Sequence, residues 1–199
     1  MHEQTQAGTT RVNNIARWDG FTWQALADEQ CERQCKHAGG QFRSQDRNCE
    51  LNGPVTALAS TGAVIFAAGV FDSAGGNQVK NLAQYFSGTW KPVLGGVVGS
   101  IFDLKVFSLA PQSSLFDSGV KDFECLYVAG DLESVVASDG MVQPLQGIAR
   151  VCLEPDSKPI GWEAVMGADM GPVLAIHVSH ELSVGRLSSP PSMPASDSN

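Results

Sequence analysis

The chain has 199 residues, of which 43% are hydrophobic and 17% charged, so it can bury a core and lacks the composition of a disordered protein. Its formal net charge is −8, which leaves no cationic surface for a phosphate backbone and argues against nucleic acid as a partner. No apolar run approaches the roughly 20 residues that a membrane-spanning helix needs. Twenty-one glycines, ten prolines and short hydrophobic runs favour short strands joined by turns, so the expected fold class is all-β.

The first predicted strand begins at a motif that recurs twice along the chain. Residues 14–18 read Asn-Ile-Ala-Arg-Trp, residues 81–85 read Asn-Leu-Ala-Gln-Tyr, and residues 147–151 read Gly-Ile-Ala-Arg-Val. Self-similarity at a fixed spacing is the signature of a repeat protein. Because the chain enters this repeat part-way, residues 1–12 are interpreted as the end of a preceding repeat.

A tryptophan opens a short apolar run after each copy of the motif, at Trp23, Trp90 and Trp162. In the first copy an Asp-Gly pair at 19–20 lies between two aromatic-flanked runs, which is a strong β-hairpin signal. A residue that recurs at one position of a repeat is more typical of packing between units than of stacking on a sugar. We therefore expect these three tryptophans, and Trp18 beside them, to lie in the core.

The first unit carries an insertion at residues 27–52. The distance from the tryptophan to the glycine that lies two residues before a β-branched residue is 30 residues there and 9 in the other two units. The insertion contains Cys31, Cys35 and Cys49, and three interpretations are open: a disulfide from Cys49 to Cys31 or Cys35, free thiols, or a zinc site whose spacing fits no common pattern. The disulfide is favoured, and it would imply an oxidising compartment.

The second unit shows all four strands that a repeat is expected to contain. The predicted strands are Val55–Ala59, Val64–Phe71, Asn81–Phe86 and Trp90–Leu94. With the insertion removed, the period is 46 residues. Units of about 40 to 50 residues with four strands are typical of β-propeller blades, whereas shorter repeats are mostly helical.

Residues 109–122 form a second predicted insertion. Beyond it, antiparallel pairing is expected to place Cys125 and Cys152 almost opposite each other, so a bridge is one interpretation. Two buried thiols are the favoured one, because cross-strand disulfides need specific geometry. A further strand is predicted around Val173–His177, the repeats are expected to end at Leu187, and the Ser/Pro-rich residues 188–199 are expected to be disordered.

The repeat also resembles a known family. Residues 14–26 read Asn-Ile-Ala-Arg-Trp-Asp-Gly-x-x-Trp-x-x-Leu, and residues 53–76 contain Gly-x-Val-x-Ala-Leu-Ala, an apolar strand and Phe-x-x-Ala-Gly-Gly. This pattern resembles kelch-like repeat proteins, which include secreted bacterial repeat proteins and fungal cortical cell-polarity markers. The repeat spacing predicts that residues 13–187 form about three four-stranded antiparallel blades of a partial β-propeller, a fragment of a larger array. The resemblance implies a propeller ectodomain or secreted scaffold, and it implies no catalytic residues.

Loops at one end of the blades are the expected binding site. In an antiparallel blade, the connections from strand two to three and from strand four to the next blade emerge at the same end, and here these are the longest and most charged loops. Binding residues concentrate in loops that a rigid scaffold presents. The predicted contacts are Arg33, Lys36, Arg43, Asp72 and Asn77, with a protein or glycan as ligand and with no metal or cofactor.

The leading hypothesis is a non-enzymatic binding or scaffold module of a secreted or cell-surface repeat protein, associated with further blades of the same parent protein. One alternative is a fragment of a kelch-fold enzyme of the copper oxidase type, with its active site in missing blades. Its metal site needs two tyrosines, and Tyr85 and Tyr127 lie on different predicted strands. The other alternative is a cytoplasmic kelch-type adaptor for protein partners.

Overall fold

A computed structural model describes residues 6–29, 31, 49–109, 123–154, 158–165 and 171–177. Every element whose bounds it gives is a β-strand, and all of the strand pairs are antiparallel. The expected all-β fold class is therefore confirmed. Within the described ranges, no helix is both long and apolar enough to cross a membrane.

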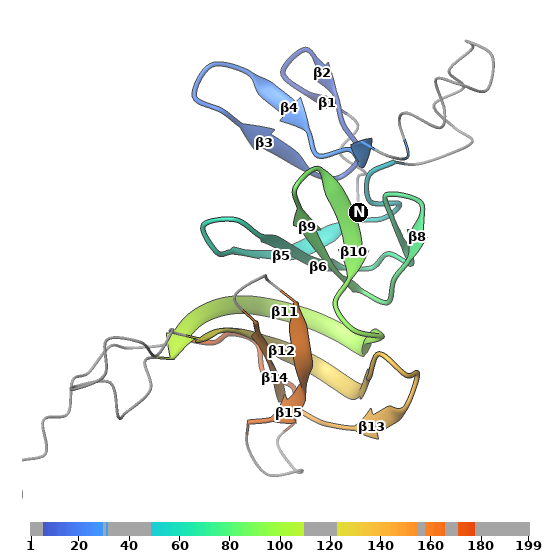
Figure 1. Cartoon of the computed structure of the whole chain (residues 1–199), viewed down its shortest axis with the longest axis vertical. Helices are drawn as coiled ribbons and strands as arrows, with labels where there is room; N and C mark the ends of the chain where they lie inside the picture. Colours follow the sequence, from blue (N-terminus) through green and yellow to red (C-terminus); the bar gives the residue numbers. More distant parts are fainter. Residues whose placement is uncertain are drawn as a thin grey trace, which may run out of the picture.

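The middle of the chain forms a four-stranded antiparallel sheet, the central sheet (Figure 1). Its strands are β5 (Val55–Ser60), β6 (Ile65–Gly69), β9 (Leu82–Phe86) and β10 (Thr89–Pro92). They lie in the order β5–β6–β9–β10, so each strand pairs with the next of the four along the chain. This is the arrangement that the sequence of the second unit predicts.

The following segment repeats this connectivity in the C-terminal sheet. Its strands are β11 (Gly96–Leu109), β12 (Phe123–Val136), β14 (Ile148–Leu153) and β15 (Pro159–Ala164), in the order β11–β12–β14–β15. A short strand, β13 (Val142–Pro144), pairs with the end of β12. Two consecutive sheets of one chain thus share one strand order.

The N-terminal part of the chain contains only two-stranded elements. β3 (Ala16–Trp18) and β4 (Trp23–Ala25) form a hairpin that corresponds to β9 and β10. β1 (Gln6–Ala7) pairs with β2 (Thr10–Arg11), and 67 residues later β7 (Ser73–Ala74) pairs with β8 (Asn77–Gln78) in the same way. The internal repeat therefore extends to the small ribbons beside the sheets.

The hairpin and the two sheets are stacked face to face, and each interface holds its own hydrophobic cluster (Figure 1). Ala83 and Trp90 of the central sheet pack with Ile15 and Leu26 of the N-terminal hairpin. On the opposite face of the central sheet, a second cluster joins it to the C-terminal sheet; it includes Phe66, Leu82, Leu126 and Val151. Burial of side chains from both faces is the main reason that the central sheet is stable.

Residues at the start of the third strand of each unit share a left-handed backbone conformation. Asn14 has φ 64°, Asn81 has φ 58° and Gly147 has φ 80°. Asparagine and glycine are the residues that adopt this conformation most readily. Asn14 Nδ2 donates to the Leu51 carbonyl at 3.1 Å and Asn81 Nδ2 donates to the Gly99 carbonyl at 3.1 Å, so each asparagine ties its unit to the segment that enters the next sheet.

The structure departs from the expectations at the C-terminal end. Residues 171–177 form no strand, although a strand is predicted there. A strand needs a continuous row of backbone hydrogen bonds to a neighbouring strand. This segment instead makes isolated hydrogen bonds to the C-terminal sheet: Val173 N–H donates to the Gly130 carbonyl at 3.0 Å, and Ile176 N–H donates to Asp103 Oδ2 at 2.9 Å. The described strands form a four-stranded sheet, a five-stranded sheet that includes β13, and three two-stranded elements, without closing into a ring. A propeller therefore stays a prediction, and residues 188–199 lie outside the described ranges.

Candidate functional site

Two disulfides join cysteines that are distant in the sequence. Cys31 is bonded to Cys49 with a Cα–Cα distance of 5.5 Å, and Cys125 is bonded to Cys152 with a Cα–Cα distance of 3.9 Å. The second bond differs from the favoured interpretation of two thiols. Cys125 and Cys152 lie directly opposite in the register of β12 and β14, which brings the two side chains together. Cys35 lies outside the described residues.

The Cys31–Cys49 disulfide lies against the β7–β8 ribbon. A Cβ atom at Gly76 would be 3.7 Å from Cys31 Sγ, and Gly75 N–H donates to the Glu50 carbonyl at 2.8 Å. Figure 1 shows β8 and β13 on the same side of the stacked sheets. We call the Cys31–Cys49 disulfide, the β7–β8 ribbon and the β12–β13 connection the loop end.

Asp28 attaches the start of the insertion to the central sheet. Its side chain is only 4% exposed, and its Oδ1 accepts a hydrogen bond from Cys31 N–H at 2.9 Å. Its Oδ2 accepts one from Trp90 N–H, also at 2.9 Å. The sequence gives no signal for this role, because Trp90 follows 62 residues later. The carboxylate therefore holds the first residues of the insertion beside Trp90 of the central sheet.

Two of the five predicted ligand contacts lie in the described part of the loop end, and both also support its own structure. Asp72 Oδ1 accepts a hydrogen bond from Asn52 Nδ2 at 2.6 Å. Asn77 Nδ2 donates to the Trp90 carbonyl at 3.0 Å, although both Asp72 and Asn77 are exposed. The predicted contacts Arg33, Lys36 and Arg43 lie outside the described residues.

The tryptophans divide into a buried and an exposed group. Trp90 is fully buried and Trp162 is 8% exposed, as expected for core residues. Trp18 is 51% exposed and Trp23 is 41% exposed, so the expectation that they belong to the core is wrong. Their rings pack against each other with centroids 5.3 Å apart, on the face of the hairpin that points away from the central sheet.

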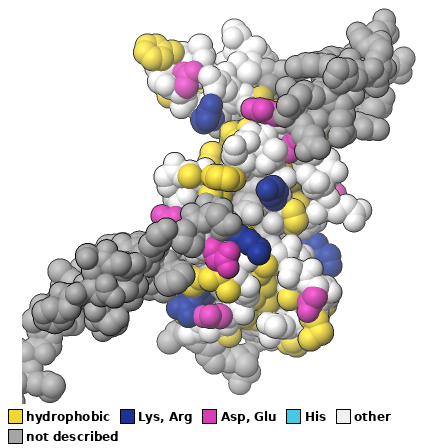
Figure 2. Space-filling model, viewed as in Figure 1, with side chains coloured by type: hydrophobic (Ala, Val, Ile, Leu, Met, Phe, Trp, Pro, Cys, Tyr) yellow, Lys and Arg dark blue, Asp and Glu magenta, His cyan; other side chains and the backbone are white. Residues whose placement is uncertain are grey.

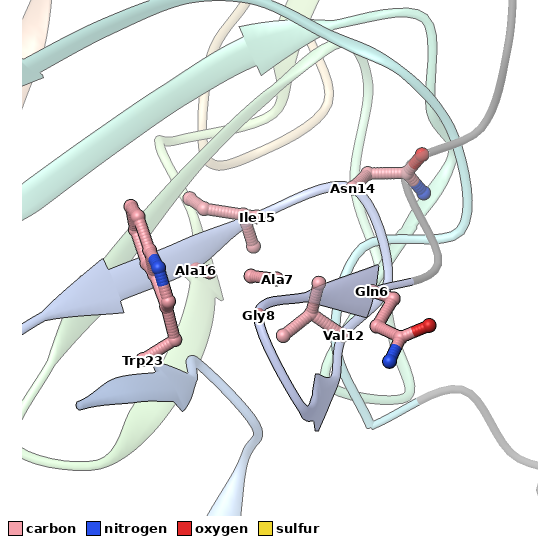
Figure 3. Close-up of a pocket in the computed structure, with 8 residues that line it drawn as sticks. All are labelled: Gln6, Ala7, Gly8, Val12, Asn14, Ile15, Ala16 and Trp23. Atoms are coloured by element: carbon pink, nitrogen blue, oxygen red, sulfur yellow. The ribbon is translucent and has the colours of Figure 1, made fainter.

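An open cavity of about 380 Å³ adjoins Trp23 (Figure 3). It lies between the hairpin and the β1–β2 ribbon, and Gly8, Val12 and Asn14 are among the residues that line it. Asn14 Nδ2 donates to the Leu51 carbonyl, and the hydroxyl of Thr10, just outside the lining, donates to the Trp23 carbonyl at 2.8 Å. Gln6 is the exposed polar side chain of the lining, which also contains Val12 and Ile15. We call Trp18, Trp23 and this cavity the tryptophan face.

The outer face of the C-terminal sheet, which points away from the central sheet, is more polar. Arg150 forms a salt bridge with Glu163, and hydrogen bonding to Tyr127 and Glu163 raises the pKa of Arg150 above its ordinary value. Phe107 packs edge-on against Tyr127, with ring centroids 6.0 Å apart. A second open cavity, of about 390 Å³, lies beside this sheet and includes Asp131 and Gln146.

No arrangement of catalytic or metal-binding groups is found in the part of the chain that the structure describes. There, no three His, Cys, Asp or Glu side chains are close enough together to hold a metal ion. Tyr85 and Tyr127 belong to different sheets, and the Tyr85 hydroxyl donates to the Ala27 carbonyl at 3.3 Å. His177 is exposed at the end of the segment 171–177.

Comparisons with family models, with curated proteins and with solved structures give no match for this chain.

Proposed function

We propose that the chain is a non-enzymatic binding or scaffold module of a secreted or cell-surface repeat protein, folded as part of a β-propeller, and that it holds a protein or glycan ligand at its loop end. The observation that carries the proposal is that the Cys31–Cys49 disulfide lies against the β7–β8 ribbon. A disulfide that closes a loop reduces the conformational freedom that the loop can lose when it binds a ligand.

The strand order supports the propeller part of the proposal. The central sheet and the four main strands of the C-terminal sheet have the same order. Their first strands lie side by side, and the Thr56 hydroxyl on β5 donates to the Ile101 carbonyl on β11 at 3.0 Å. Each first strand also has a bulge that begins two residues after the recurring glycine, between Val55 and Ala57 in β5 and between Ile101 and Asp103 in β11. Repeated sheets with the same strand order and the same irregularity are what a propeller needs.

The disulfides support a secreted or surface location, since disulfides persist in oxidising compartments and are rare in the cytosol. Mass spectrometry of freshly secreted material under non-reducing conditions tests this point. The expected result is two bonds, Cys31–Cys49 and Cys125–Cys152. Fully free thiols would favour the intracellular adaptor instead.

Binding is tested with the secreted chain on arrays of extracellular proteins and glycans. We expect a ligand whose binding is weakened at least tenfold by Lys36→Glu combined with Arg43→Glu, because charge reversal at the loop end removes two cations from the proposed contact. Phe21→Ser is the matched control, since this 89% exposed residue lies in the β3–β4 turn, away from the loop end. A ligand that responds to Phe21→Ser and not to the charge reversal would contradict the proposed site.

A further inference from the structure

The exposed tryptophan pair occupies a position that is covered in the next unit. Trp18 and Trp23 correspond to Tyr85 and Trp90, and both pairs are cross-strand neighbours with their rings inclined at 55°. The ring centroids are 5.3 Å and 5.0 Å apart, respectively. The same ring arrangement is therefore built twice, once in an interface and once at the surface. Figure 2 shows hydrophobic side chains at the surface of the β3–β4 hairpin, at the upper left.

The covered pair shows what such a surface binds. Trp90 Nε1 donates to the Leu26 carbonyl at 2.6 Å, and the Tyr85 hydroxyl donates to the Ala27 carbonyl at 3.3 Å. Leu26 and Ala27 follow β4, the last strand of the preceding unit. A tryptophan or tyrosine pair at this position therefore recognises the end of a fourth strand, through apolar contact and through its backbone carbonyls.

The outer face of the C-terminal sheet has the features of that receiving surface. In the N-terminal hairpin the receiving face contains Ile15 and Leu26, with Arg17 Nη2 donating to Gln24 Oε1 at its edge. The equivalent residues in the C-terminal sheet are Ile148 and Val165, with Arg150 paired to Glu163. Ile148 is half-buried and Val165 is 36% exposed, so both have surface left to cover.

From this correspondence we propose that the tryptophan face binds a second copy of the chain, at the outer face of its C-terminal sheet. Trp18 and Trp23 of one copy pack on Ile148 and Val165 of the next, and Trp23 Nε1, which has no hydrogen-bond partner among the described residues, donates to the Val165 carbonyl. This inference goes beyond the proposed ligand binding, because it uses neither the loop end nor its charges. Because the two contacting surfaces differ, the contact is head-to-tail, and it produces a ring or a chain of copies.

A sugar is a poorer occupant of the same surface. Protein sites for sugars combine aromatic rings with several converging polar groups. Beside Trp23 the Asn14 amide and the Thr10 hydroxyl already donate to backbone carbonyls, which leaves Gln6 as the exposed polar side chain of the cavity lining. An apolar strand end needs only the rings and the indole N–H. The observations therefore favour another sheet of this repeat as the partner.

Sedimentation velocity over a range of protein concentrations tests the proposal. The expected result is a sedimentation coefficient that rises with concentration, and an association at least about tenfold weaker in Trp23→Ala, as is usual for a tryptophan at the centre of an interface. Met141→Ser, which changes a 64% exposed residue near β13, is the control and should associate like the unaltered chain. A chain that is monomeric at every concentration, or a Trp23→Ala variant that associates normally, would overturn the proposal.

A crosslinking experiment identifies the partner surface and does not depend on how well Trp23→Ala folds. A photoreactive phenylalanine replaces Trp18 in isotopically light chain, which is mixed with heavy chain so that crosslinks between copies are recognised by mass. Crosslinks from the light to the heavy chain within residues 148–165 are expected, and crosslinks to the partner's own β3–β4 hairpin would contradict the head-to-tail contact. Lys36→Glu with Arg43→Glu should leave the association unchanged, which separates this test from that of the proposed function.

Discussion

Asn81 has two roles at one backbone position. It lies directly before β9 in the left-handed backbone conformation, with φ 58°. Its side-chain amide donates to the carbonyls of Gly99 at 3.1 Å and Val97 at 3.4 Å. Asn81→Ala should lower the free energy of unfolding by about 2 kcal/mol, because alanine is strained at positive φ and leaves two partly buried carbonyls without this donor. Asn81→Gly should cost about half as much, since glycine keeps the backbone conformation. Urea denaturation measures both, and an Asn81→Gly variant as stable as the unaltered chain would show that the side-chain hydrogen bonds contribute nothing.

The pKa of Asp103 makes the stability of the chain depend on pH. Although burial raises the pKa of this carboxyl, hydrogen bonds from Ile176 N–H and Lys105 hold it below its ordinary value of 3.8. A group with a lowered pKa in the folded state stabilises the fold above its unfolded pKa, and this contribution is lost as the pH falls through the folded pKa.

Asp103→Asn should therefore reduce stability at pH 6 and make it less dependent on pH below about 4. The check is a series of urea denaturation curves between pH 6 and pH 2.5. Asp139→Asn is a suitable control, because this exposed carboxylate lies in the turn before β13. A variant whose pH profile parallels that of the unaltered chain would show that Asp103 does not contribute.

At the scale of elements, the pairing of first and second strands depends on a glycine. A Cβ atom at Gly130 on β12 would collide with the Ser100 carbonyl oxygen on β11, and one at Gly69 on β6 would collide with the Pro54 carbonyl oxygen. Both collisions involve backbone, which cannot move without breaking the bulged strand pair. Gly130→Ala should therefore destabilise the chain by at least about 3 kcal/mol or prevent folding.

Gly62→Ala is the matched control for Gly130→Ala. Gly62 lies in the β5–β6 turn with no atom within 4 Å of an added Cβ, and its φ is not positive. The substitution should leave stability unchanged or raise it by less than about 1 kcal/mol, through the lower entropy of the unfolded chain. Thermal unfolding followed by circular dichroism compares the two variants, and similar midpoints would contradict the backbone collision.

The tryptophan in the hairpin of the third and fourth strands is expected to contribute different amounts to stability in successive units. Trp90→Phe should lower stability by about 2 kcal/mol, because it leaves the buried Leu26 carbonyl without its indole donor and creates a small cavity. Trp23→Phe should change the stability of the isolated chain by less than about 0.5 kcal/mol, since this ring is 41% exposed. Equal losses in denaturation experiments would show that the two positions are equally buried in solution.

At the scale of the whole molecule, side-chain packing joins the stacked sheets, and a disulfide links neighbouring strands β12 and β14 within the C-terminal sheet. The Cys125–Cys152 bond closes a loop with a sequence separation of 27 residues. Replacing both cysteines with alanine should lower the free energy of unfolding by about 3 kcal/mol, chiefly because the unfolded chain gains freedom. Guanidinium denaturation without reductant measures the loss, and a double variant as stable as the unaltered chain would rule out this bond in the folded protein.

The local features of the repeat could be predicted from the sequence because they depend on short-range chemistry. The repeated apolar runs, the tryptophan that opens one of them and the position of glycines indicate each strand of the central sheet, and β5, β6, β9 and β10 overlap the predicted ranges. The strand at residues 171–177 was predicted wrongly because its formation depends on long-range pairing. A strand needs a neighbouring strand along its length, and the sequence of the segment does not reveal whether one is present.

What the sequence by itself determined about this protein is the all-β class, the order of the strands and the period of the repeat, because hydrophobic periodicity and turn residues act over a few positions. Only the tertiary structure decided which copy of a repeated residue is buried. Trp23 and Trp90 have the same local sequence role, but Trp90 lies between two stacked units and Trp23 lies at the open face of the first. Burial depends on what packs against a strand, and the strand's own residues do not encode it.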